Sequence, residues 1–319
     1  MKRIAVLTTG GDAPGMNAAV RAVVRSALAR KVEVMGVYRG YQGLIDEDIK
    51  PLNHRSVSGI INQGGTILKT ARCPEFKTED GKKQALETLK RNNIEGMIVI
   101  GGNGSFSAAH EFYLQYQFPC VGIPASIDND VNGIDVTIGS DTAINTALDA
   151  IDKVRDTATS MERIFVIEVM GRECGYMALQ VALAGGCEDV IIPEKKCDFS
   201  DLCHSIVGGN IRGKISWIIV LAEGAAKAEE VARNIRERTS LETRSVVLGH
   251  VQRGGKPTAF SRTLALNLGQ LAVESLLSGE ADIAVGLRYG ELITIDFEDA
   301  VKKKEWDVEK LYRLLKTVS

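Results

Sequence analysis

Short apolar runs alternate with amphipathic segments along the whole chain of 319 residues. Apolar residues recur at helical spacing over residues 16–30, which predicts a helix there. Eight short runs rich in Val and Ile predict strands buried on both faces, at residues 3–9, 32–38, 96–102, 120–124, 163–171, 189–193, 216–223 and 245–250. This alternation indicates an α/β fold, in which helices cover a parallel sheet.

Paired glycines follow two of these strands, in GGDAPG (10–15) and GGNGS (101–105). Ligands of such sheets bind at the carboxyl ends of the strands, and a glycine loop that opens a helix presents N–H groups to an anion. The chain has no GxxxxGK[ST] loop, and neither segment completes GxGxxG. Each loop alone is more simply a strand-to-helix turn, whereas the two together could hold one polyphosphate.

The segment PASIDNDVNG (124–133) places Asp128 and Asp130 two residues apart after a predicted strand. One carboxylate could accept a proton from an attacking hydroxyl group while the other faces a metal or the substrate. A turn rich in Asn and Asp is the alternative interpretation of the same residues.

Cationic residues near predicted strand ends favour the first interpretation of that segment. They are Arg163, Arg172, Arg244, His250 and Arg253. A lone arginine is usually a surface residue, but several beside strand-end glycines suit a phosphate ester, because guanidinium groups match phosphate geometry. Polyphosphate loops, an acidic hydroxyl activator and these cations together indicate phosphoryl transfer to a phosphorylated alcohol.

Composition narrows the class of protein further. The net charge of −2 and pI near 6.2 give no global positive field for nucleic acid. No apolar stretch approaches the roughly 20 residues that span a bilayer, and the first residues do not form a signal peptide, so we expect a cytoplasmic protein with no membrane partner. The six cysteines lack CxxC spacing and are expected to be reduced and mostly buried.

The motifs GGDAPGMNAAVR, TARCPEF, SIDND, VMGR, ETR and VLGHVQRGG occur in the order found in bacterial ATP-dependent 6-phosphofructokinases, which the whole chain resembles. The resemblance implies two similar three-layer α/β domains with mostly parallel sheets, and a homotetramer. It implies transfer of the ATP γ-phosphoryl group to the 1-hydroxyl of fructose 6-phosphate, a step of glycolysis, with Mg²⁺. The implied domains are a larger ATP-binding one (1–139 and 252–304) and a smaller one for fructose 6-phosphate (140–251 and 305–319).

The resemblance also assigns roles to individual residues. Asp128 would be the base, Ser126 stands where threonine is usual, and Arg172 would neutralise the transferring phosphoryl group. The nucleotide residues would be Gly11, Arg72, Cys73, Gly102, Asn103, Gly104 and Ser105. The fructose 6-phosphate residues would be Ser126, Asp128, Asp130, Arg163, Met170, Gly171, Arg172, Glu223, Arg244, His250 and Arg253. Arg163 and Arg244 would act across a subunit interface.

A second anion site is implied for an effector, ADP or phosphoenolpyruvate. Its residues would be Arg21, Arg25, Arg155, Gly186, Glu188, Arg212 and Lys214. Arg21 and Arg25 share one side of the helix predicted at 16–30, which by itself is a solvated helix face. The match to the family is partial, because Gly59 stands where a carboxylate is common and Ile215 replaces a lysine.

Asn103 departs from the GGDG of the family, whose aspartate helps to hold magnesium. The amide keeps one carbonyl oxygen but loses the charge, so we expect slower but not abolished catalysis. A catalytically weakened regulatory subunit is therefore one alternative function. A pyrophosphate-dependent enzyme is another, although Gly104 and Ala125 stand where such relatives carry aspartate and lysine.

Overall fold

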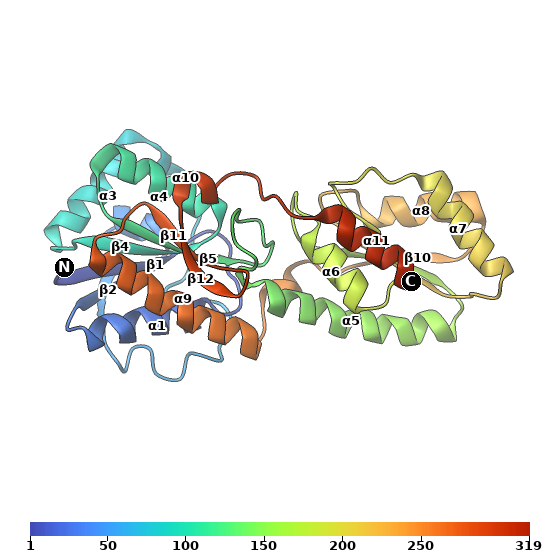
Figure 1. Cartoon of the computed structure of the whole chain (residues 1–319), viewed down its shortest axis with the longest axis horizontal. Coiled ribbons are helices and arrows are strands. Elements are labelled where there is room, and N and C mark those ends of the chain that lie inside the picture. Colours follow the sequence, from blue (N-terminus) through green and yellow to red (C-terminus); the bar gives the residue numbers. More distant parts are fainter. The chain divides into compact units, whose positions relative to one another are not determined.

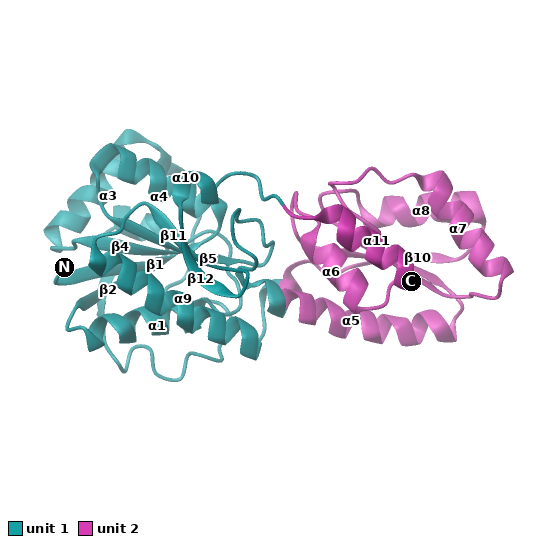
Figure 2. Ribbon diagram, in the orientation of Figure 1, with its two compact units in different colours: residues 1–142, 253–305 teal, residues 143–252, 306–319 magenta.

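The computed structural model describes residues 1–319, which form two compact units (Figure 2). Unit 1 comprises residues 1–142 and 253–305, and unit 2 comprises residues 143–252 and 306–319. The domain limits expected from the resemblance differ from these by one to three residues, and the ligand expected for each domain stays a prediction. None of the helices is both long and apolar enough to cross a lipid bilayer.

Unit 1 is built on one sheet whose central strands are parallel. β3 is antiparallel to β2 at one edge, β12 is antiparallel to β11 at the other, and β6 pairs with β5 alone. The spatial order is β12 (Glu291–Asp296), β11 (Ile283–Arg288), β5 (Cys120–Ser126), β4 (Gly96–Gly101), β1 (Arg3–Thr8), β2 (Glu33–Val37) and β3 (Ile49–Leu52), with β6 (Ile138–Gly139) beside β5.

Helices cover both faces of this sheet (Figure 1). α1 (Met16–Ala29) and α9 (Ala259–Ser278) pack against each other on one face. The other helices of the unit are α2 (Tyr41–Ile45), η1 (Pro74–Lys77), α3 (Glu79–Arg91), α4 (Asn103–Tyr116) and α10 (Phe297–Ala300). Side chains alternate along β1, so Ala5 and Leu7 point into a core cluster with Phe106 and Phe112 of α4. Unit 1 therefore has the helix-covered sheet that its sequence pattern predicts and the three layers that the resemblance implies.

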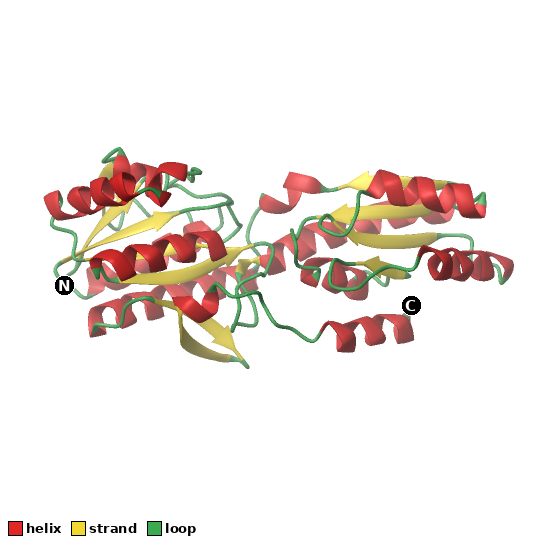
Figure 3. Cartoon of the chain, turned by 90° about the horizontal axis from the view of Figure 1, so that it is seen from above, coloured by secondary structure: helices red, strands yellow, loops and turns green.

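Unit 2 repeats this arrangement on a smaller, fully parallel sheet (Figure 3). Its order is β10 (Thr243–Val247), β7 (Ile164–Val169), β9 (Trp217–Ala222) and β8 (Asp189–Ile191). Its helices are α6 (Tyr176–Ala184), α7 (Phe199–Ile211), α8 (Ala228–Thr239), α11 (Val308–Val318) and most of α5 (Ser140–Ser160). Leu202 and Ile206 of α7 join Val166 and Leu221 of the sheet in one core cluster.

Seven of the eight predicted strands and the helix over 16–30 are confirmed, each end within two residues. The eighth predicted strand is also present, but its predicted bounds, 245–250, are displaced by two residues at the start and three at the end. β10 spans Thr243–Val247 at the edge of its sheet, where only β7 pairs with it, so most of its residues are partly exposed. The chain then turns into a 3-10 helix, η2 (Gly249–Arg253). The strands β3, β6, β11 and β12 were not predicted.

Candidate active site

Three loops meet at one edge of unit 1, because β1, β4 and β5 are neighbouring parallel strands whose carboxyl ends lie together. Ser105, from the loop after β4, ties two of the loops together. Its hydroxyl group donates to the carbonyl oxygen of Thr9, which follows β1, at 3.2 Å. Tyr41 in turn donates to the carbonyl oxygen of Ser105 at 2.6 Å. The glycine loops predicted to hold a polyphosphate are therefore fixed to each other.

The loop after β5 carries the two predicted acidic residues. The hydroxyl group of Ser126 donates to Oδ1 of Asp130 at 3.0 Å and accepts the backbone N–H of Asp128 at 3.2 Å. Asp128 is 2% exposed. The buried side chain of Asn129, at φ 52°, accepts from the N–H of Thr137 at 2.9 Å and braces the turn. The loop thus holds a buried carboxylate in a fixed place, as a catalytic base requires.

Asn103 is the first residue of α4 and lies against the acidic loop. Its amide Nδ2 donates to the carbonyl oxygen of Asp130 at 2.8 Å, while its Oδ1 is buried and accepts no hydrogen bond. No cluster of three or more His, Cys, Asp or Glu side chains is arranged to hold a metal ion. This buried oxygen without a hydrogen bond fits a metal that arrives with a nucleotide, since Mg²⁺ takes few protein ligands and several phosphate or water oxygens.

Other predicted nucleotide residues line the same edge of unit 1. A Cβ at Gly11 would clash with the guanidinium group of Arg253, so that arginine lies directly against the first glycine loop. A Cβ at Gly104 would meet no atom within 4 Å, which leaves open space above the second loop. Cys73 packs on the core cluster that contains Tyr41 and Phe76, whose rings stack at 4.1 Å.

A second group of predicted residues meets at the carboxyl ends of β7 and β9 in unit 2. Gly171 and Arg172, in the loop that follows β7, have φ angles of 138° and 51°. The N–H of Arg172 donates to Oε1 of Glu223 at 3.0 Å, from the end of β9. Positive φ at a residue other than glycine is strained, so this contact helps to hold Arg172 in an unusual backbone conformation.

Two residues that the sequence analysis missed hold the same loop. Gln252, which is fully buried, accepts the N–H of Met170 through Oε1 at 2.9 Å. Both carboxylate oxygens of Glu194 accept the N–H of Gly175, at 2.8 and 3.1 Å. Each is a polar residue just after a predicted strand, but nothing in the sequence says which backbone group it would reach.

Arg163 and Arg244 lie at the opposite edge of the sheet in unit 2. Arg163 directly precedes β7, and Arg244 is the second residue of β10, paired with Phe165. At about 3.3 Å per residue, the length of β7 separates Arg163 from Met170 by about 20 Å. The structure therefore does not bring these two arginines to the other predicted fructose 6-phosphate residues of unit 2.

The carboxylate of Glu242 forms ion pairs with both arginines. Glu242 pairs with Nε of Arg163 at 2.9 Å and with Nη2 of Arg244 at 2.6 Å. The contact with Arg163 lowers the pKa of Glu242, and Arg244 adds to the effect. Two guanidinium groups that share one anion stand close enough together to share a phosphate group.

The family model described as Phosphofructokinase matches residues 3–276 of the chain. The chain belongs to the phosphofructokinase family. A protein of Thermotoga neapolitana named ATP-dependent 6-phosphofructokinase is 53% identical over 319 residues, which cover the whole of both chains. A protein of Bacillus subtilis with the same name is 51% identical over the same coverage. The expected α/β phosphofructokinase fold is confirmed.

Two solved phosphofructokinases match at least 95% of this chain. The structure of phosphofructokinase from Saccharomyces cerevisiae has a TM-score of 0.88 and 35% identity, and the match covers 95% of this chain and 45% of the yeast chain. A pyrophosphate-dependent phosphofructokinase from Marinobacter aquaeolei has a TM-score of 0.85 over 99% of this chain and 91% of its own. Its identity is 19%, so this second likeness concerns the fold alone.

The effector residues expected from the likeness to phosphofructokinases form one group in each unit. In unit 1, Arg21 donates to the carbonyl oxygen of Val57 at 2.8 Å, and burial and then the charge of Arg25 lower the pKa of Arg21. In unit 2, Nζ of Lys214 pairs with Glu188 at 3.2 Å. Arg155 donates to the carbonyl oxygens of Gly185 and Gly186, and Arg212 caps the end of α7. Each group stays a predicted part of an effector site.

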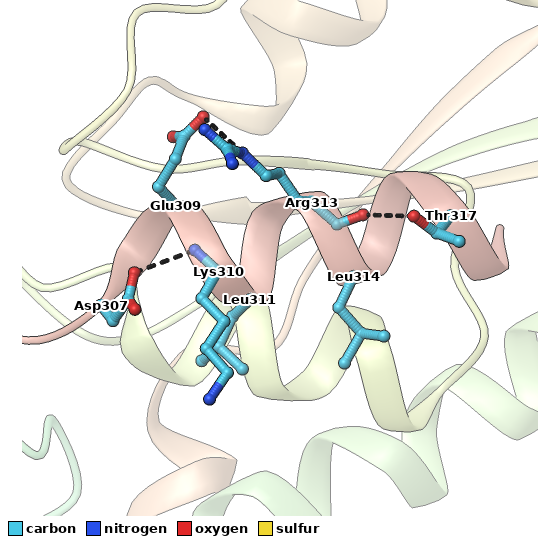
Figure 4. Close-up of a pocket in the computed structure, with 7 residues that line it drawn as sticks. All are labelled: Asp307, Glu309, Lys310, Leu311, Arg313, Leu314 and Thr317. Carbon is cyan, nitrogen blue, oxygen red and sulfur yellow. Dashed lines mark hydrogen bonds and ion pairs between the residues drawn. The ribbon is translucent and has the colours of Figure 1, made fainter.

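Two surface hollows of unit 2 lie apart from the predicted phosphofructokinase residues. One, of about 590 Å³, runs along α11 and is lined only by that helix and its N-cap residue Asp307 (Figure 4). Its polar side chains are used within the helix, as in the contacts from Asp307 to the N–H of Lys310 and from Glu309 to Arg313. The other, of about 260 Å³, lies beside Asp189, Cys197 and Tyr312. Neither hollow contains a residue of the predicted sites.

Proposed function

We propose that the chain is an ATP-dependent 6-phosphofructokinase, which transfers the γ-phosphoryl group of ATP to the 1-hydroxyl of fructose 6-phosphate. The observation that carries the proposal is the contact between the acidic loop after β5 and the N-terminus of α4. That contact ties the loop that carries the buried carboxylate of Asp128 to a helix N-terminus, whose N–H groups suit a phosphate. The full-length likeness to ATP-dependent 6-phosphofructokinases supports the same reaction.

Asp128 takes the proton of the 1-hydroxyl group as that oxygen attacks the γ-phosphorus. The bond from the γ-phosphorus to the bridging oxygen breaks, and ADP leaves with the electron pair. Ser126 holds the backbone of Asp128, and Arg172 offsets the negative charge on the transferring group. Met170, Gly171, Glu223, His250 and Arg253 would bind the sugar phosphate with Arg163 and Arg244.

Mg²⁺ would arrive with the nucleotide, as part of that substrate. Oδ1 of Asn103 is one buried acceptor of unit 1 that could face it, on the residue whose amide group contacts the backbone of Asp130. The ion would offset phosphate charge. Because the amide is neutral, we expect weaker affinity for Mg²⁺ than a carboxylate at residue 103 would give.

The choice of phosphoryl donor is tested by measuring fructose 1,6-bisphosphate formation with MgATP and, separately, with pyrophosphate. We expect turnover with ATP and none with pyrophosphate, because the space above Gly104 is open to a nucleotide. Turnover with pyrophosphate alone would make the chain a pyrophosphate-dependent enzyme. No turnover with either donor, together with binding of fructose 6-phosphate, would make it the weakened regulatory subunit.

The proposal extends to the location, assembly and regulation of the enzyme. We place the enzyme in the cytoplasm as a homotetramer that responds to ADP or phosphoenolpyruvate. Arg21 supports the effector assignment, because burial and then the charge of Arg25 lower its pKa, and a bound anion would offset both charges.

Cys73 offers a chemical test of the nucleotide site. Cys73 and Cys197 are half-buried, whereas the other four cysteines are buried. Burial raises the pKa of Cys73, and it raises that of Cys197 to about 11, so both thiols should react slowly. We expect ATP at ten times its Kd to slow alkylation of Cys73 about tenfold. Alkylation of each cysteine is followed by mass spectrometry of peptides.

Cys197 is the internal control, because it lies in unit 2 beside the hollow that contains no predicted site residue. Its alkylation should not change with ATP. Equal rates at Cys73 with and without ATP would show that the nucleotide does not cover this residue.

A further inference from the structure

Asn103 holds the acidic loop by a contact that a carboxylate cannot make. The atom facing Asp130 lies 2.8 Å from a backbone carbonyl oxygen, which can only accept. That atom must therefore be the amide nitrogen, and Oδ1 must point away, where it is buried and accepts no hydrogen bond. The orientation of the amide follows from the contact itself.

The contact joins two segments that carry the proposed chemistry. Asn103 is the first residue of α4. Asp130 accepts a hydrogen bond from the hydroxyl group of Ser126, and that hydroxyl oxygen accepts a hydrogen bond from the N–H of Asp128. The chain of contacts runs from Asn103 through Asp130 and Ser126 to Asp128. Movement of Asp130 away from α4 would therefore loosen the backbone of the proposed base.

An aspartate at residue 103 would place a carboxylate oxygen against the carbonyl oxygen of Asp130. The two acceptors repel each other, and the hydrogen bond is lost. The N-terminus of α4 favours a negative charge and would offset part of this loss. A bound metal would remove the repulsion, because it supplies a positive charge to both oxygens.

We propose that Asn103 is a positioning residue that keeps the acidic loop ordered without a metal ion. The neutral amide binds Mg²⁺ more weakly than a carboxylate would. In return, it holds the loop in place before the nucleotide arrives. This inference rests on the proposed function for its catalytic meaning, while the order of the loop can be measured without any turnover.

The test is hydrogen exchange of residues 127–133 in the full-length protein with excess EDTA. We expect Asn103→Asp and Asn103→Ala each to speed exchange in this segment about five- to tenfold, the effect of losing one net hydrogen bond. Added MgCl₂ and ATP should restore protection in Asn103→Asp but not in Asn103→Ala. Wild-type protection should be the same with EDTA and with MgCl₂.

The matched control is Asn132→Asp. Asn132 also donates its amide to a carbonyl oxygen, that of Asp299 at 3.2 Å, but it lies outside the chain of contacts that reaches Asp128. The same change of charge there should leave the exchange of Asp128 unchanged. Wild-type exchange in EDTA at or above the rate of Asn103→Asp overturns the proposal, whatever the activity assay gives. Absence of turnover with protection intact would instead count against the proposed function alone.

Discussion

Replacing Asp128 by asparagine should lower kcat about 10²- to 10⁴-fold, which is the usual contribution of a general base. Asparagine has nearly the same shape, so the hydrogen bond from the N–H of Asp128 to Ser126 should survive. The KM for fructose 6-phosphate should change little, because the lost group acts on the proton and not on the phosphate. Steady-state kinetics with MgATP measure both constants.

Asp149→Asn is the matched control for this prediction. Asp149 lies on α5, its side chain is 72% exposed, and it pairs only with Lys153 one turn away. Its loss should leave kcat within the error of the assay. A fall of less than tenfold in Asp128→Asn would mean that another group takes the proton.

The fold could be predicted largely from runs of buried apolar residues. β1, β4, β5, β7 and β9 lie inside their sheets with nearly every residue buried, so an unbroken apolar run marks each of them. β12 shows why the other strands were not predicted. It is an edge strand that exposes most of its residues, so no apolar run marks it.

The candidate site could be predicted in part, because its loops follow those same buried strands. The rule that ligands bind at carboxyl ends is enough to bring the segments after β1, β4 and β5 together. The contact of Asn103 with Asp130 could not be predicted, since it depends on the orientation of one amide across 27 residues of sequence. Glu194 was missed for the same reason.

The sequence did contain one signal that the prediction left unused. Arg163 begins its apolar run, whereas Arg172 follows it, and a residue at the start of a parallel strand lies at the amino edge of the sheet. The prediction placed all the arginines near strand ends, and it did not distinguish the amino edge of the sheet from the carboxyl edge. The structure separates them, and the pairing of Arg163 and Arg244 with Glu242 shows that they form a group of their own.

The position of Arg163 and Arg244 predicts that activity depends on the assembly of several chains. Within unit 2 Arg163 lies about 20 Å from Met170, and Arg244 pairs with Phe165 near the same end of β7, so we expect them to serve a phosphate at a site completed by another copy of the chain. The double variant Arg163→Ala/Arg244→Ala should lose about 10²-fold or more in kcat/KM for fructose 6-phosphate, since each charged hydrogen bond contributes a factor of about ten or more. Asp128→Asn should be nearly inactive on its own.

Mixing these two variants should restore activity that neither has alone. A site that takes its base from one chain and its arginines from a neighbour is intact when the first chain is the arginine variant and the second is Asp128→Asn. In randomly mixed symmetric assemblies this combination occurs at about a quarter of the sites, so about a quarter of wild-type kcat should return. The measurement is turnover of co-expressed chains purified through two different tags, with each variant co-expressed with itself as the control. A mixture with only the mean activity of its two parents would mean that Arg163 and Arg244 serve the site of their own chain, or none.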